Sequence, residues 1–199
     1  ASLLNHAIVQ DCFIGEVCKI SNGFTAEQSV VFANSNLSKG EASAAFCGPF
    51  TISLSKKAQL TNGMYGLYNN FHGEVLRNPN MRNLSFSRLT TQGETTYLVP
   101  AFNMTTAALY HAIRKWPRHD MRPQTAARSI VNFDWLSPFS VDEIIKAKQI
   151  LEDLRDISGE DAPHYSNHGL IIRAADLQKG IQNYSAYLHG SSNRTYTKI

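Results

Sequence analysis

The hydrophobic period changes twice along this chain, and that change limits the folds it can adopt. Apolar residues recur at helical spacing from Leu3 to Ile20, alternate with polar residues between about residues 50 and 102, and then return to helical spacing. A period near 3.6 residues is typical of an amphipathic helix, and a period of two is typical of a half-buried strand. The pattern predicts an α+β fold with a central antiparallel sheet over about residues 50–102, flanked by N-terminal and C-terminal helices.

Turn and cap signals place the ends of the first elements. Asn22-Gly23 ends the first predicted helix, and the segment from Thr25 to Gln28 has the pattern of a capping box that starts a second helix. The segment from Thr91 to Glu94 is predicted to turn one strand of the sheet into the next. No internal repeat and no interdomain linker is evident, so residues 1–199 are expected to form a single compact domain.

The last third of the chain carries the clearest helical pattern. A capping box opens a helix at Ser140, and Ile145, Leu151 and Leu154 are expected on its buried face. A short strand over Leu170–Arg173 is predicted to precede a final helix.

The composition excludes several classes of protein. No stretch approaches the roughly 18 uninterrupted apolar residues of a membrane span, and the first residues lack the basic start of a signal peptide. Cys12, Cys18 and Cys47 have no Cys-x-x-Cys spacing, which favours a reducing compartment over a disulfide framework. We therefore expect no membrane partner, and a location in the cytoplasm or, for a small viral or effector protein, delivery into a host cell.

Charge is distributed unevenly along the chain. Residues 114 to 128 hold five basic residues against Asp120 alone, an excess larger than the +3 of the whole chain, and Trp116 among them could stack on bases. Arginine forks suit phosphate and carboxylate oxygens. This segment is the predicted anion-binding site, made of Arg114, Lys115, Trp116, Arg118, Arg122 and Arg128.

Residues 142 to 161 have the opposite charge, with seven acidic residues against three basic ones. Two partners for the basic segment follow from this contrast: nucleic acid, or the acidic helix of a neighbouring protein, which could be another copy of the chain. The leading hypothesis is a non-enzymatic binding or assembly subunit. Ordinary solvated surface remains the alternative interpretation of both charge clusters.

A cysteine-dependent hydrolase or deamidase is the alternative function. Cys47 lies in a predicted sharp turn, His164 and His168 flank a loop-to-strand junction, and Asp176 follows. This chain order of nucleophile, base and orienting acid permits a catalytic triad, although no family signature surrounds the three positions. The sequence has no Walker loop, no Gly-x-Gly-x-x-Gly and no Cys-x-x-Cys, so neither a cofactor nor a metal is expected.

Overall fold

The computed structural model of this protein describes residues 1–54, 56, 58–61, 64–65, 70–72, 80–81, 83–104, 114–131, 133–134 and 137–192. Internal contacts divide the chain into two compact units. The first contains the described residues up to Met64 and those from 114 to 133, and the second contains the described residues of 65–72, 79–109 and 134–192. The sequence predicts a single domain, in which the two units would unfold together. This expectation stays a prediction.

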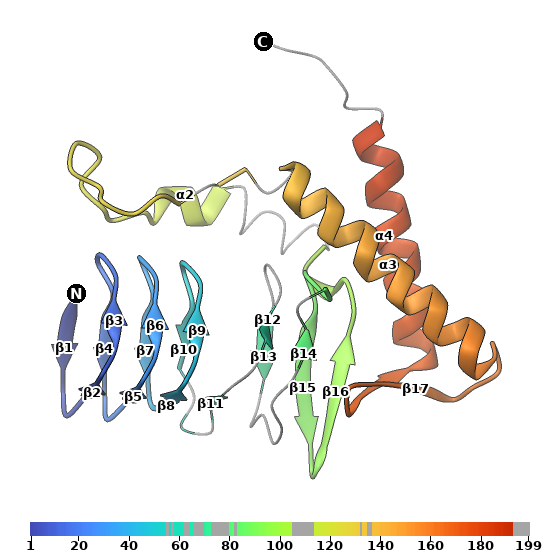
Figure 1. Ribbon diagram of the computed structural model, residues 1–199, viewed down its shortest axis with the longest axis horizontal. Helices are drawn as coiled ribbons and strands as arrows, with labels where there is room; N and C mark the ends of the chain where they lie inside the picture. The colour runs from blue at the N-terminus through green and yellow to red at the C-terminus, as the bar shows by residue number, and fades with distance from the viewer. Residues whose placement is uncertain are drawn as a thin grey trace. The chain divides into compact units, whose positions relative to one another are not determined.

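The first unit is a β-solenoid, in which short parallel strands stack coil upon coil (Figure 1). Ser2 is aligned with Lys19, Asn36 with Ile52 and Gly40 with Ala58, so each coil takes 16 to 18 residues. Parallel strands need a connection of a dozen residues or more, and here each coil is itself that connection. A strand of an inner coil therefore pairs with the coil before it and the coil after it.

The strands of the solenoid form three faces. The first face contains β1 Ser2–Leu4, β4 Lys19–Ser21, β7 Asn36–Ser38 and β10 Ile52–Ser53. The second face contains β2 Ile8–Gln10, β5 Thr25–Glu27, β8 Gly40–Ser43 and β11 Ala58–Thr61. The third face contains β3 Phe13–Ile14, β6 Val30–Val31 and β9 Phe46–Cys47.

From β4 to β9, one side chain of each strand fills the interior of the coil. These inward residues follow one another after five or six positions, and they are buried: Ile20, Ala26, Val31, Leu37, Ala42 and Cys47. Equivalent positions of neighbouring coils, such as Ile20 and Leu37, are aligned in the sheet. The core is therefore a set of stacked columns, one under each face.

Three corners join the faces, and each is marked by residues with positive φ that are not glycine. The first corner has Asn5, Asn22 and Lys39, the second has Asp11, Gln28 and Ala44, and the third has Val17, Asn34 and Phe50. The left-handed conformation costs an ordinary L residue roughly 1–2 kcal/mol. Because the same conformation recurs in every coil, the strands on both sides of a corner remain in register.

Small polar side chains inside the corners bind backbone groups at the strand ends. The Cys18 thiol donates to the Phe32 carbonyl at 3.0 Å, and the Ser35 hydroxyl donates to the same carbonyl at 2.7 Å. The Ser35 hydroxyl also accepts from the Thr51 N–H at 3.2 Å. Ser29 makes equivalent bonds at the preceding corner. Buried backbone groups are costly when unpaired, so Cys18 stabilises a corner of the fold.

The predicted N-terminal helices and the α+β class are therefore wrong, and the chain does contain a repeat. Ile20 and Leu37 of one solenoid column are 17 residues apart, so a window as long as one helix contains a single member of each column and does not reveal the repeat. The predicted capping box at Thr25 lies in β5 instead of at a helix start. The predicted central antiparallel sheet is wrong too, because β10 and β11 are parallel strands of the solenoid.

The second unit is built on a five-stranded mixed sheet. Its order is β13 Asn70–His72, β15 Arg88–Gln92, β16 Thr95–Val99, β18 Leu170–Arg173 and β17 His164–Asn167. β15 and β16 form the antiparallel hairpin predicted around Gly93. β12 Met64–Tyr65 and β14 Asn80–Met81 form a separate pair, and a short 3-10 helix, η1, covers Phe102–Met104.

Two long helices complete the second unit, α3 Pro138–Ser158 and α4 Ala174–Ser192. These helices and β18 confirm the predictions for the last third of the chain. Two details differ: the N-cap of α3 is Ser137 rather than Ser140, and Ile145 is 50% exposed because Ile144 faces the core instead. Among the described helices, none is long and apolar enough to cross a membrane.

The solenoid makes a direct prediction about Leu37 and Leu54. Leu37 is fully buried between coils, whereas Leu54 is 61% exposed. We expect Leu37→Ala to lower the free energy of unfolding by about 2–5 kcal/mol, because it removes buried methyl groups and leaves a cavity. Leu54→Ala, the matched control, should cost well under about 1 kcal/mol. If urea denaturation showed equal losses of unfolding free energy in the two variants, the inward position of Leu37 would be contradicted.

Candidate functional site

The predicted basic segment forms an extended arm on the solenoid. We call the described residues of 114–133 the arm; they include the short helix α2 Trp116–Arg118. The arm belongs to the same compact unit as the coils, and Figure 1 shows it running along one edge of them. That edge is the third corner, because the contacts of the arm are with residues in or beside this corner.

Asn34 and Glu16 hold the arm at this corner. The Asn34 side chain donates to Asp120 Oδ1 at 2.8 Å and accepts from the Met121 N–H at 3.1 Å. Glu16 accepts from the N–H groups of Arg128 and Ser129, at 2.9 and 2.7 Å, and from the Ser129 hydroxyl at 2.6 Å. These donors, led by the Ser129 hydroxyl, hold the pKa of Glu16 below its usual value.

Arg122 stabilises the arm through hydrogen bonds to other residues of the arm. Its guanidinium donates to both oxygens of Asp120, at 2.9 and 2.6 Å, and to the Ser129 carbonyl. The side chain is only 8% exposed. The hydrogen bond from Arg122 lowers the pKa of Asp120, and the same bond raises the pKa of Arg122. We assign Arg122 a positioning role, because its donors are used inside the arm.

The other basic side chains of the arm point to solvent. Arg114, Lys115, Arg118 and Arg128 are all exposed, and among the described residues no carboxylate lies within ion-pair distance of them. The Trp116 side chain lies outside the described part of the structure. The four exposed cations are therefore available to an anion while the backbone beside Arg128 is fixed by Glu16.

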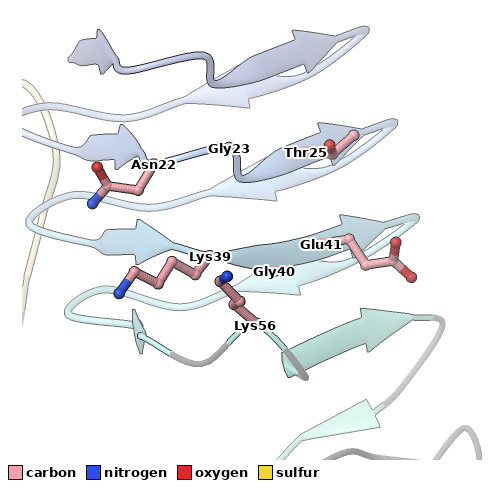
Figure 2. A pocket seen from close by; sticks show the side chains of 7 residues that line it. All are labelled: Asn22, Gly23, Thr25, Lys39, Gly40, Glu41 and Lys56. Carbon is pink, nitrogen blue, oxygen red and sulfur yellow. The ribbon is translucent and has the colours of Figure 1, made fainter.

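A second basic feature lies at the first corner. A shallow polar depression of about 380 Å³ is lined by Asn22, Gly23, Thr25, Lys39, Gly40, Glu41 and Lys56. Lys39 and Lys56 occupy successive coils, and Figure 2 shows Glu41 at the other end of the depression. Both lysines are exposed. Because Glu41 offsets one of the two cations, this depression is less basic than the arm.

Cys47 occupies an inward position of the third face. It is 5% exposed, and its Cα is aligned with that of Val31. Burial raises the pKa of the Cys47 thiol to about 11. A nucleophilic cysteine needs a lowered pKa and partial exposure, so the surroundings of Cys47 are those of a structural thiol.

The remaining residues of the predicted triad lie in the second unit. His164 is an exposed residue of β17, His168 is exposed in the turn between β17 and β18, and Asp176 is half-buried in the first turn of α4. Cys47 belongs to the first unit. Within the described ranges, no group of three His, Cys, Asp or Glu side chains is arranged to hold a metal ion.

Sequence reasoning missed the residues that position the arm. Glu16 and Asn34 lie within predicted helices, where they were ordinary polar positions. The missing signal is the repeat of 16 or 17 residues, which places Val17, Asn34 and Phe50 at one corner. Polar residues at such a corner are exposed candidates for contacts with another segment.

Comparisons with known proteins identify a family for most of the chain. The family model described as "Domain of unknown function (DUF4954)" matches residues 1–78 and 71–155. No curated protein matches the chain. No solved structure matches it either.

The arm contacts predict a specific pH dependence. The pKa values of Glu16 and Asp120 are lowered in the folded protein, so their contribution to stability is present above the unfolded values of about 4 and is lost as the pH falls through the folded ones. We expect Asp120→Asn to reduce stability at pH 7 and to flatten its decline in acid. Asp11→Asn, an exposed aspartate at the second corner, is the control. Identical acid declines in both variants and the wild type would contradict the assignment.

Proposed function

The chain belongs to the DUF4954 family, and we propose that it is a non-enzymatic binding subunit whose arm holds a nucleic acid. One observation carries the proposal: Arg114, Lys115, Arg118 and Arg128 are exposed on an arm that Glu16 and Asn34 fix to the solenoid. A fixed backbone reduces the conformational entropy lost when cations bind phosphates. Four cations on one short arm suit the repeating charge of a nucleic acid strand.

The acidic segment around α3 is a weaker partner for the arm than nucleic acid. Lys146 lies 2.5 Å from Asp142 and 3.7 Å from Glu143, and Lys148 lies 2.8 Å from Glu152. Arg155 pairs with two further carboxylates. Most acidic side chains of this segment therefore already have a cationic partner within the same molecule. Three cations do not cancel seven carboxylates, but these ion pairs would have to exchange before the arm could bind there, which favours nucleic acid over a second copy of the chain.

Thiol chemistry has less support than binding. The burial of Cys47 and the raised pKa of its thiol disfavour the thiolate that a hydrolase or deamidase needs. We therefore do not propose that the chain is a cysteine-dependent hydrolase or deamidase.

A salt series with charge-reversal variants tests the proposal. We expect the wild type to bind a fluorescent 20-nucleotide oligonucleotide at low salt, with log affinity falling as log salt rises. Arg118→Glu with Arg128→Glu should weaken binding and reduce the slope by roughly 0.7 for each phosphate that the variant no longer neutralises. Because the change lies at exposed side chains, thermal unfolding should show that the variant stays folded.

The control makes the same charge change elsewhere on the solenoid. Lys39→Glu with Lys56→Glu alters net charge equally but acts at the first corner. We expect this control to keep most of the slope of the wild type. Failure of the wild type to bind, or equal losses of affinity in both variants, would overturn the proposal. Self-association without oligonucleotide that disappears in the Arg118/Arg128 variant would indicate an acidic protein partner instead.

A further inference from the structure

Phenylalanine side chains cover the outer surface of the third face. Phe13 and Phe46 are 59% and 64% exposed, and both are aligned with Val30 of the intervening coil. Phe32 lies between their rings, with centroid distances of 6.5 Å to Phe13 and 5.0 Å to Phe46. We call these three rings the aromatic strip. Its rings contact one another, so it is a continuous surface.

A glycine allows two coils to approach each other closely beside the aromatic strip. Gly15 and Gly48 follow Ile14 and Cys47, which are aligned with Val31, so both glycines are neighbours of Phe32 across the coils. A Cβ on Gly15 would lie 2.9 Å from the backbone nitrogen of Ala33, which a side chain cannot accommodate. Gly15 therefore permits a close approach of two backbones next to the strip, whereas a Cβ on Gly48 would meet nothing within 4 Å.

The other faces have no such strip among their described residues. Ile8 and Ile52 are each 59% exposed, but they are aligned with polar Thr25 and Asn36. Single exposed apolar residues are normal on a protein surface, whereas contiguous ones mark interaction sites. Leu3 and Leu4 of the first face are exposed too, but they are aliphatic, so among the described residues of the solenoid the strip is the feature that offers exposed aromatic rings.

The basic arm borders the aromatic strip. Phe13 is three residues before Glu16, which binds Arg128, and Phe32 is two residues before Asn34, which binds Asp120. At about 3.3 Å per residue, these anchoring points lie within roughly 10 Å of the rings along the chain. Figure 1 shows the arm along the corner that β3, β6 and β9 approach. The arm, which carries the exposed cations, thus runs along one side of an exposed aromatic surface.

We propose that the strip and the arm together bind a single-stranded nucleic acid. The bases stack on Phe13 and Phe46, with Phe32 supporting the two rings, and the phosphates contact Arg118 and Arg128. This combination of aromatic platforms and a basic groove is how proteins bind single strands without reading sequence. A duplex hides its base faces in its own stack, so the strip selects the single strand. The inference rests on the proposed function of the arm and adds the class of nucleic acid.

Three fluorescent probes of equal length test the inference: an oligo(dT) strand, an abasic strand with the same phosphates, and a duplex. We expect the wild type to bind oligo(dT) more tightly than the abasic strand, by roughly five- to a hundredfold for each stacked base. Phe13→Ser with Phe46→Ser should remove that advantage and leave abasic binding and the salt slope unchanged. The duplex has more phosphates than either strand but cannot stack its bases on the strip, so the Phe13/Phe46 variant should bind it as tightly as the wild type does.

A matched control separates stacking from a general loss of surface. Ile8→Ser with Ile52→Ser removes two apolar side chains of the same exposure from the other faces, and oligo(dT) binding should be unchanged. Equal affinity of the wild type for oligo(dT) and the abasic strand would overturn stacking while leaving the proposed function intact. Loss of abasic binding in the Phe13/Phe46 variant would also overturn it. Binding of none of the probes would instead overturn the proposed function itself.

Discussion

Backbone pairing between successive coils is the constraint on which the first unit depends. Each short strand has few side chains to bury, so its stability comes from parallel hydrogen bonds to the coils on both sides. In-register pairing requires corners of nearly constant geometry, which accounts for positive φ at residues as unsuited to it as Val17 and Phe50. Ser29, Ser35 and Cys18 complete the corners by bonding backbone groups.

Because the coils are in register, equivalent positions of successive coils form columns on the surface. The side chains of these columns differ from one face to the next. Outward positions carry phenylalanine on the third face and mostly polar residues on the other two, while the third corner presents Glu16 and Asn34 to the arm. The repeated backbone thus places an anchor for the arm in each of two successive coils. The proposed binding surface depends on this arrangement, because the exposed arginines have a fixed position only while the arm is attached.

The sequence predicted the second unit better than the first. The hairpin around Gly93, β18 and the two long helices have local signals, since their periods are two or 3.6 over enough residues to be distinctive. In the solenoid, inward residues such as Ile20, Ala26 and Val31 recur after five or six positions, a spacing that resembles neither template. The basic segment was visible from charge alone. Its attachment was not, because Glu16 binds Ser129, which is 113 positions away in the sequence. The internal role of Arg122 was not visible either, because its bonds to Asp120 and to the Ser129 carbonyl depend on how the arm folds back on itself.

Residue-resolved hydrogen exchange of the arm tests the central claim, that the arm is fixed to the third corner. The N–H groups of Arg128 and Ser129 donate to the Glu16 side chain, so their exchange is slow only if the arm lies where we describe it. We expect both amides to be protected in the wild type and to lose protection in Glu16→Ala, while Gly15 and Phe32, which bond between coils, stay protected. Exchange of Arg128 and Ser129 at the rate of an unstructured peptide in the wild type would contradict the account.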